Sequence, residues 1–299
     1  MATMDTDHNC LLFSSPLVSA GTFDCPVTAP DFTNTGPIDD YLLAFPRTAV
    51  KIRHREMRRA IVADPNIVTI YNKGQEYERY PLSPYGDRCD WLTVCPATVC
   101  EMLNSLGVRQ TGDPDRLFQV THSMSSPAAY ASLRRLIADL HRHPATDAVA
   151  VEETVLRIFQ HTLCAAYAER GPAMPKRRAT GAKHSELVRQ TCELLATRYT
   201  DPLSVALLAR EVNTSAYHLC RVFRRLTGAT IHCYLTQLRL RASLQAVSEP
   251  RSDLATLGIN LGFSDHSHFS QSFRKAFGIT PSEYRRTCRV TEPRQLSLH

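Results

Sequence analysis

The feature that most constrains this chain is an amphipathic pattern that occurs twice in its C-terminal third, at residues 215–228 and 264–278. The first copy places apolar residues at the i, i+3, i+4 and i+7 spacing that lines one face of a helix, and the second repeats the arrangement. The apolar residues are Leu219, Val222, Phe223 and Leu226 in the first copy and Phe269, Phe273, Ala276 and Phe277 in the second. The outer faces are polar and free of acid, so we expect two helices with similar exposed surfaces.

Each copy has the end signals of a helix and a shorter helical pattern before it. Ser215 and Ser264 are residues that cap helix N-termini, and a glycine, 228 or 278, stands where a helix ends in the left-handed conformation. The shorter patterns cover residues 205–212 and 254–261. The sequence therefore predicts two helix-turn-helix units, a motif whose second helix enters the major groove of DNA.

A connecting helix is predicted at residues 231–247. Its length is roughly 25 Å at 1.5 Å per residue. Successive major grooves on one side of a duplex are about 34 Å apart. The connector is thus compatible with two second helices that read adjacent grooves.

The residues of the second unit resemble a known family. The segment 262–285, with the sequence GFSDHSHFSQSFRKAFGITPSEYR, is similar to the C-terminal signature of AraC/XylS transcriptional regulators. The segments 218–223, 234–235 and 238–241, with Gly228 between the first two, resemble the first unit and connecting helix of that family. The resemblance covers about residues 184 to 287 and implies a bacterial-type DNA-binding regulator.

The resemblance also implies which residues touch DNA, because family members use the early turns of both recognition helices to contact bases. By position these residues are Tyr217, Cys220 and Arg221 in the first helix and His266, Ser267, His268, Ser270 and Gln271 in the second. Arg224 and Arg274 lie farther along the same outer faces and complete the predicted DNA-binding set. Among them, Arg221 is the strongest base-reading candidate, since arginine pairs bidentately with guanine.

Three residues depart from the family pattern. Gly258 replaces a small helix former, and glycine inside a helix costs roughly 0.5–1 kcal/mol relative to alanine, so we expect a looser first helix in the second unit. Gln271 stands where the family often has arginine, which removes a charge but allows a bidentate pair with adenine. Ser243 stands where alanine is usual.

The charge of the chain is unevenly distributed. Residues 184–290 contain 14 Arg plus Lys and 8 Asp plus Glu, a net charge of +6, whereas residues 1–175 contain 16 and 20, a net charge of −4. Charges on amphipathic helices ordinarily just solvate the exposed face, and Arg224, Arg225, Arg274 and Lys275 taken singly fit that role. A basic domain that also carries both helix-turn-helix patterns favours a phosphate polymer as partner, with binding that weakens steeply as salt rises.

The length of 299 residues is sufficient for two domains. We expect a regulatory domain at 1–170 that senses an effector or dimerises, a linker rich in proline, glycine and charge at 171–183, an AraC-type DNA-binding domain at 184–290 and a tail at 291–299. Short β-like runs occur at residues 60–63, 67–71, 75–80 and 88–95, separated by turn signals. They predict a small barrel or sandwich.

Two helices are predicted after this β-rich region, at residues 127–142 and 149–169. The apolar stripe of the second helix, formed by Val151, Val155, Ile158, Phe159 and Thr162, either covers the barrel or pairs with a second copy of the chain. The family resemblance implies a cupin-like barrel. The expected fold class is therefore α+β, with a β-rich N-terminal barrel, trailing helices and an all-α C-terminal domain.

The resemblance further implies partners beyond double-stranded DNA: RNA polymerase, if the protein is an activator, a small-molecule effector and a second copy of the chain. Tyrosines of the N-terminal region and Trp91 fit either an effector pocket or the barrel core. No effector contact is identifiable from the sequence.

The ten cysteines do not form a metal-binding pattern, because the sequence contains no Cys-x-x-Cys or Cys-x-x-His pair. We predict mostly buried thiols, no cofactor and no metal, with Cys220 beside the DNA-reading face as the exception. Some relatives of this domain are fused to a methyl-accepting cysteine domain that repairs DNA. That chemistry needs clustered zinc-bound thiolates, so we expect no enzyme.

The sequence shows no secretory signal and no stretch that approaches the ~20 apolar residues of a membrane span, which predicts a cytoplasmic protein without membrane contact. The predicted function is a sequence-specific transcription regulator, in the form of an activator under effector control. The alternatives are an architectural DNA-binding protein without an effector and, less favoured, the methyl-acceptor repair enzyme.

Overall fold

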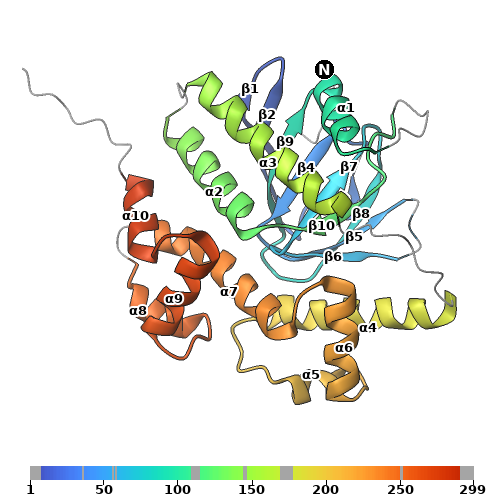
Figure 1. The fold of residues 1–299 in the computed structure, drawn as a ribbon, viewed down its shortest axis with the longest axis vertical. Helices are drawn as coiled ribbons and strands as arrows, with labels where there is room; N and C mark the ends of the chain where they lie inside the picture. The colour runs from blue at the N-terminus through green and yellow to red at the C-terminus, as the bar shows by residue number, and fades with distance from the viewer. Residues whose placement is uncertain are drawn as a thin grey trace, which may run out of the picture.

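The computed structural model combines a β-rich N-terminal part with a helical C-terminal part, joined along one side (Figure 1). The structure describes residues 8–35, 37–55, 57, 59–108, 115–143, 147–168, 178–249 and 252–289. The predicted α+β class is confirmed, with two sheets in the N-terminal part and two helix-turn-helix units in the C-terminal part.

Two antiparallel sheets form the N-terminal domain. The larger one has the order β1 (Asn9–Ser14), β2 (Val18–Cys25), β9 (Asp87–Val94), β4 (Leu42–Pro46), β7 (Ile67–Tyr71) and β10 (His122–Met124). The smaller one has the order β3 (Asn34–Thr35), β8 (Tyr77–Pro81), β5 (Val50–His54) and β6 (Ile61–Ala63). The four runs predicted from the sequence correspond to β6, β7, β8 and β9.

One apolar core lies between the two sheets. Tyr71 and Trp91 belong to it, at 2% and 5% exposure, and the Trp91 indole N–H donates to Asn9 Oδ1 at 2.7 Å. These aromatic residues are therefore core residues. The same region buries an ion pair, because Arg79 Nη1 donates to Asp87 Oδ2 at 3.0 Å while its guanidinium lies over the ring of Phe23.

Three helices cover the outer face of the larger sheet: α1 (Pro96–Ser105), α2 (Pro127–Arg142) and α3 (Ala148–Ala168). The predicted ranges of α2 and α3 agree with these bounds to within one residue at each end. All five residues of the apolar stripe on α3 are buried, with exposures of 4% or less. The stripe therefore covers the sheet of its own chain and does not form a free surface for a second copy.

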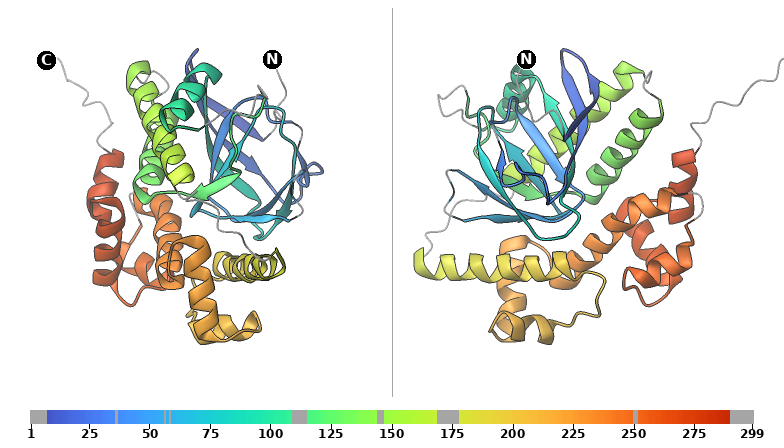
Figure 2. Two further views of the ribbon diagram at one scale, coloured as in Figure 1. Left: turned by 45° about the vertical axis from the view of Figure 1, so that its right-hand side comes forward. Right: turned by 180° about the vertical axis from the view of Figure 1, so that it is seen from behind.

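The C-terminal part consists of α4 (Arg178–Thr197), α5 (Val205–Glu211), α6 (Ala216–Thr227), α7 (Ile231–Ser248), α8 (Leu254–Asn260), α9 (His266–Phe277) and α10 (Pro281–Arg289). Helix α7 joins the two helical pairs, α5–α6 and α8–α9, as predicted. Figure 2 shows α4 and α6 below the smaller sheet and α8 to α10 beside α2. The contacts with the N-terminal domain are made by α4, which packs against β6, and by α7, α9 and α10, which pack against α2.

Part of the segment predicted as a linker, 171–183, is helical. Residues 178–183 belong to helix α4, and the rest of the predicted linker, 171–177, lies outside the described residues, as does the tail at 291–299. The proline- and glycine-rich composition pointed to an irregular segment, but Lys183 and the residues around it continue into the apolar pattern of α4, whose Leu195 is fully buried.

Candidate DNA-binding surface

The first helical pair has the capping that its sequence predicts. Ser215 Oγ accepts a hydrogen bond from the His218 backbone N–H at 3.2 Å, and Gly228 ends α6 in the left-handed conformation at φ 73°. Leu219 and Phe223 are fully buried, with the Phe223 ring edge-on to Tyr234 of α7. Capping and packing together fix which face of α6 points outward.

One apolar residue of α6 departs from the prediction. Leu226 is 37% exposed and lines a cavity between the two domains, whereas the periodicity placed it in the buried stripe. The reason is that the last turn of α6 lines this cavity opposite Ile61 and Val62 of β6. Leu226 consequently faces the N-terminal domain across open space.

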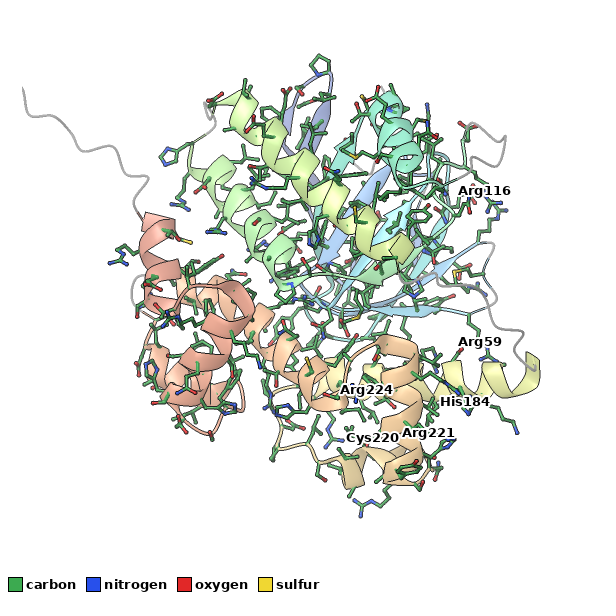
Figure 3. All side chains as sticks on the ribbon, viewed as in Figure 1. Arg59, Arg116, His184, Cys220, Arg221 and Arg224 are labelled. Carbon is green, nitrogen blue, oxygen red and sulfur yellow. The ribbon has the colours of Figure 1, made fainter. Side chains whose placement is uncertain are left out.

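The outward face of α6 gathers all four residues that were predicted to bind DNA from this helix. Tyr217, Cys220, Arg221 and Arg224 are exposed and line a hollow of about 500 Å³. The Arg221 guanidinium carbon lies 6.0 Å from the centre of the Tyr217 ring. Figure 3 shows the labelled side chains of Cys220, Arg221 and Arg224 on this helix.

The structure adds two residues to this face that the sequence analysis did not select. Arg225 lines the same hollow, and its Nη2 is 2.7 Å from His184 Nδ1 on helix α4. Desolvation and the nearby cation of Arg225 lower the pKa of His184, so its ring favours the neutral form that accepts this hydrogen bond. The neighbouring Arg224 could have pointed to Arg225 in the sequence. No local sequence pattern could have placed His184, which lies on α4, beside it.

Helix α9, the second helix of the second pair, begins one residue later than predicted. The N-cap of α9 is Asp265, whose Oδ1 accepts from the His268 backbone N–H at 2.8 Å, and Ser264 instead donates its hydroxyl to Asp265 Oδ2 at 3.0 Å. The hydrogen bonds from His268 and Ser264 lower the pKa of Asp265, which stays ionised at the positive end of the helix. The prediction that Ser264 caps α9 was therefore wrong. The Asp265 carboxylate lies instead at the N-terminal end of the exposed face of α9.

The outer face of α9 presents most of the predicted contact residues. The exposed ones are His266, Ser267, His268, Gln271 and Arg274. Ser270 is half-buried, with its hydroxyl 3.3 Å from His266 Nε2. The inner face buries Phe269 and Phe273 completely, while Ala276 and Phe277 are half-buried. Both α6 and α9 thus expose a face rich in arginine, histidine and amide or hydroxyl groups.

Comparison with known proteins agrees with this geometry. A family model described as a helix-turn-helix domain matches residues 208–287. The Msm operon regulatory protein of Streptococcus mutans is 31% identical over 99 residues, which cover 33% of this chain and 36% of that protein. The arabinose operon regulatory protein of Escherichia coli is 31% identical over 102 residues, which cover 34% and 35%. The chain carries a DNA-binding domain of the AraC/XylS family.

A solved structure is similar to part of the chain. It is a transcriptional regulator with an AraC-type DNA-binding domain from Chromobacterium violaceum, 28% identical, with a TM-score of 0.34, covering 38% of this chain and 98% of that one. The chain spans about a third of the length of the curated operon regulators it matches.

The structure explains one of the three departures from the AraC/XylS pattern, Gly258, and locates the other two. A Cβ at Gly258 would lie 2.9 Å from Cβ of Phe269, so glycine here allows α8 to cross α9 closely. This close crossing accounts for a glycine at position 258, and the expectation of a looser α8 stays a prediction. Ser243 is fully buried and donates to the Leu240 carbonyl at 2.6 Å, and Gln271 is exposed on the outer face.

The cysteines of the described residues do not assemble into a thiolate cluster. The group of potential metal ligands found there is His8, Cys25 and Asp31, which contains a single cysteine. Arg79 Nη2 lies 3.6 Å from Cys25 Sγ, and burial raises the pKa of this thiol, so both charge and protonation oppose cation binding. The described residues therefore lack the clustered cysteines that a zinc-dependent methyl acceptor needs. Among the same residues, none of the helices has the length and apolar character needed to cross a bilayer.

Proposed function

We propose that this chain is a sequence-specific transcription regulator whose helices α6 and α9 read successive major grooves. The observation that carries the proposal is the placement of two helices with exposed, hydrogen-bonding faces at the two ends of one continuous helix, α7. A rigid connector of 18 residues spans roughly 27 Å at 1.5 Å per residue. This length suits two readers on one side of a duplex.

The residues divide into two roles under this proposal. Arg221, Gln271 and the two exposed histidines of α9 stand in the early turns and read base edges, for which arginine with guanine and glutamine with adenine are the bidentate pairs. Arg224 and Arg274 stand in the last turns of α6 and α9, where they contact phosphates and fix the register. Tyr217, Cys220, Ser267 and Ser270 complete the contact surface.

Effector control is the second part of the proposal, and we place its site between the domains. A cavity of about 470 Å³ there is lined by residues of both, among them Ile61 and Met124 from the sheets, Val188 from α4 and Leu226 from α6. Its lining combines apolar side chains with polar and charged ones, among them Arg59, Glu186 and Arg189. A small amphipathic molecule in this cavity would contact α6 directly, through Leu226, and so change the position of this DNA-reading helix.

Two further partners belong to the proposal. An activator bound upstream of a promoter acts by contacting RNA polymerase, and we include this partner. Homodimerisation stays a prediction. The apolar stripe on α3 no longer supports it, because this stripe is buried within its own chain. The second candidate function, an architectural DNA-binding protein without an effector, is disfavoured by the cavity that both domains line.

Replacement of single arginines separates base reading from phosphate contact. Arg221→Ala should weaken binding to a duplex selected by the full chain by about 1–3 kcal/mol and relax the preference at one base pair. Arg274→Ala should weaken binding to selected and random duplexes equally. Fluorescence anisotropy with both duplexes measures the effects. Equal losses on the two duplexes for Arg221→Ala would remove Arg221 from the base-reading residues.

A further inference from the structure

The loop between β6 and β7 forms a buried polar contact with helix α7. The Tyr234 hydroxyl donates to Asp64 Oδ2 at 2.8 Å, and Asn66 Nδ2 donates to the Tyr234 backbone carbonyl at 2.9 Å. All three side chains are 1% exposed or less. Burial raises the pKa of Asp64 to about 6, which reflects how completely water is excluded from this junction.

Arg241 is the centre of this contact. Its Nη1 donates to the Pro65 carbonyl at 2.9 Å and to Asn66 Oδ1, and its Nη2 donates to the Ser125 carbonyl, while the guanidinium lies 5.2 Å from the centre of the Tyr130 ring. The side chain is 4% exposed, and desolvation lowers its pKa to about 10. A buried cation is costly unless it is hydrogen-bonded, and the acceptors of Nη1 and Nη2 all belong to the N-terminal domain, while Nε is buried without a hydrogen-bond partner. These acceptors are in place only while the two domains are docked.

Arg239, two residues before Arg241 on α7, points to the opposite side of the helix. Arg239 and Arg241 project about 200° apart around α7, since successive helical residues are separated by about 100°. Arg239 donates to the carbonyls of Tyr199, Asp201 and Gly262, which lie before α5 and after α8. Arg239 therefore ties the two helix-turn-helix units to each other, whereas Arg241 ties their common helix to the N-terminal domain.

The docked arrangement leaves the reading faces uncovered. Tyr217 and Arg221 on α6 and His268 and Gln271 on α9 are all exposed while Arg241 is buried. The second unit is held as well, because Arg142 of α2 donates to the Cys288 carbonyl of α10. The N-terminal domain therefore holds α7 and α10 in place and leaves those four residues of the proposed DNA-reading faces exposed.

We infer that Arg241 is a positioning residue through which the N-terminal domain fixes helix α7 and, with it, the mutual orientation of the two readers. This inference rests on the proposed function and adds the contact that transmits regulation. Simultaneous engagement of two linked sites gains far more affinity than either site alone, and the gain depends on geometry. Loosening Arg241 should therefore reduce binding that needs both readers and spare binding that needs one.

The test uses the full chain, a duplex selected by it, and the same duplex with either half-site scrambled. Arg241→Met should weaken binding to the intact duplex at least about tenfold and change binding to the half-site duplexes less than about twofold. Asn66→Ala removes the same contact from the N-terminal side, far from any DNA-facing residue, and should give the same split. Arg198→Met is the control, since this arginine pairs with Asp201 and Glu211 inside the C-terminal domain. Its loss should lower all affinities alike.

Hydrogen exchange supplies a measurement that is independent of DNA. The backbone N–H groups of Asn66, Ile67 and Ser125 are hydrogen-bonded within the junction and should exchange faster in Arg241→Met than in Arg198→Met. An unchanged ratio of intact to half-site affinity in both Arg241→Met and Asn66→Ala would overturn the inference. If the unaltered chain itself shows no preference for a selected duplex, the proposed function fails instead.

Discussion

Replacing Phe273 by alanine is expected to destabilise the C-terminal domain by about 3–5 kcal/mol, the cost of removing a large buried aromatic side chain. Phe273 is fully buried, and its ring lies 5.8 Å from Phe269, 4.6 Å from Phe277 and 5.8 Å from Tyr284 between ring centres. Without this ring, α9 loses its packing against α10 and its outward face is no longer held. Urea denaturation followed by circular dichroism measures the stability, and DNA binding should be lost in parallel.

Tyr217→Ala is the matched control for this prediction. Tyr217 is also aromatic and lies on the other reading helix, but it is 77% exposed. Surface substitutions usually change stability by about 0.5 kcal/mol or less. An equal loss of stability in both variants would show that burial of Phe273 is not what holds α9.

Arg79→Met should destabilise the N-terminal domain by about 3–5 kcal/mol, because it leaves a buried carboxylate without its partner. Arg79 is 1% exposed and Asp87 is 5% exposed, and the guanidinium also donates to the Phe32 carbonyl. Burial already raises the pKa of Asp87, and Arg79 opposes that rise. In the variant, the folded-state pKa of Asp87 rises further above its unfolded value, so stability falls as pH rises through this interval.

The measurement is thermal unfolding of the full chain between pH 5 and pH 8, with the deficit of Arg79→Met growing toward the higher pH. Arg55→Met provides the comparison, since Arg55 pairs with Glu76 at the surface with side chains 75% and 43% exposed. Exposed pairs contribute about 0–1 kcal/mol. A deficit of Arg79→Met that is small and independent of pH would contradict the role assigned to the buried pair.

The helices of the C-terminal domain were predictable because their signals are local. Apolar periodicity, a capping serine and a terminating glycine define α6 within its own residues. The one-residue error at the start of α9 arose where Ser264 and Asp265, both good capping residues, stand side by side. At Gly258 the low helix propensity is visible in the sequence, but the Phe269 side chain that needs the space is not.

The strands and the junction between the domains were less accessible. Strand β4 is buried at every position, so it lacks the alternation that marks a half-exposed strand, and it was not predicted. The bond from Asn66 to the Tyr234 carbonyl joins residues 168 positions apart. No local pattern encodes such a pairing. The residues proposed to contact DNA on α6 and α9 could be named from the sequence, whereas Arg225 beside His184 and the buried contacts of Arg241 required the structure.

The spacing between the two half-sites of a selected duplex tests the central claim most directly. Insertion of about 5 base pairs, half a turn, moves one major groove to the opposite side of the DNA. A rigid α7 cannot follow this rotation, so the full chain should lose at least about tenfold in affinity and fall to the level of a single half-site. Equal affinity for the original and the expanded duplex would contradict a pair of readers held on one connecting helix.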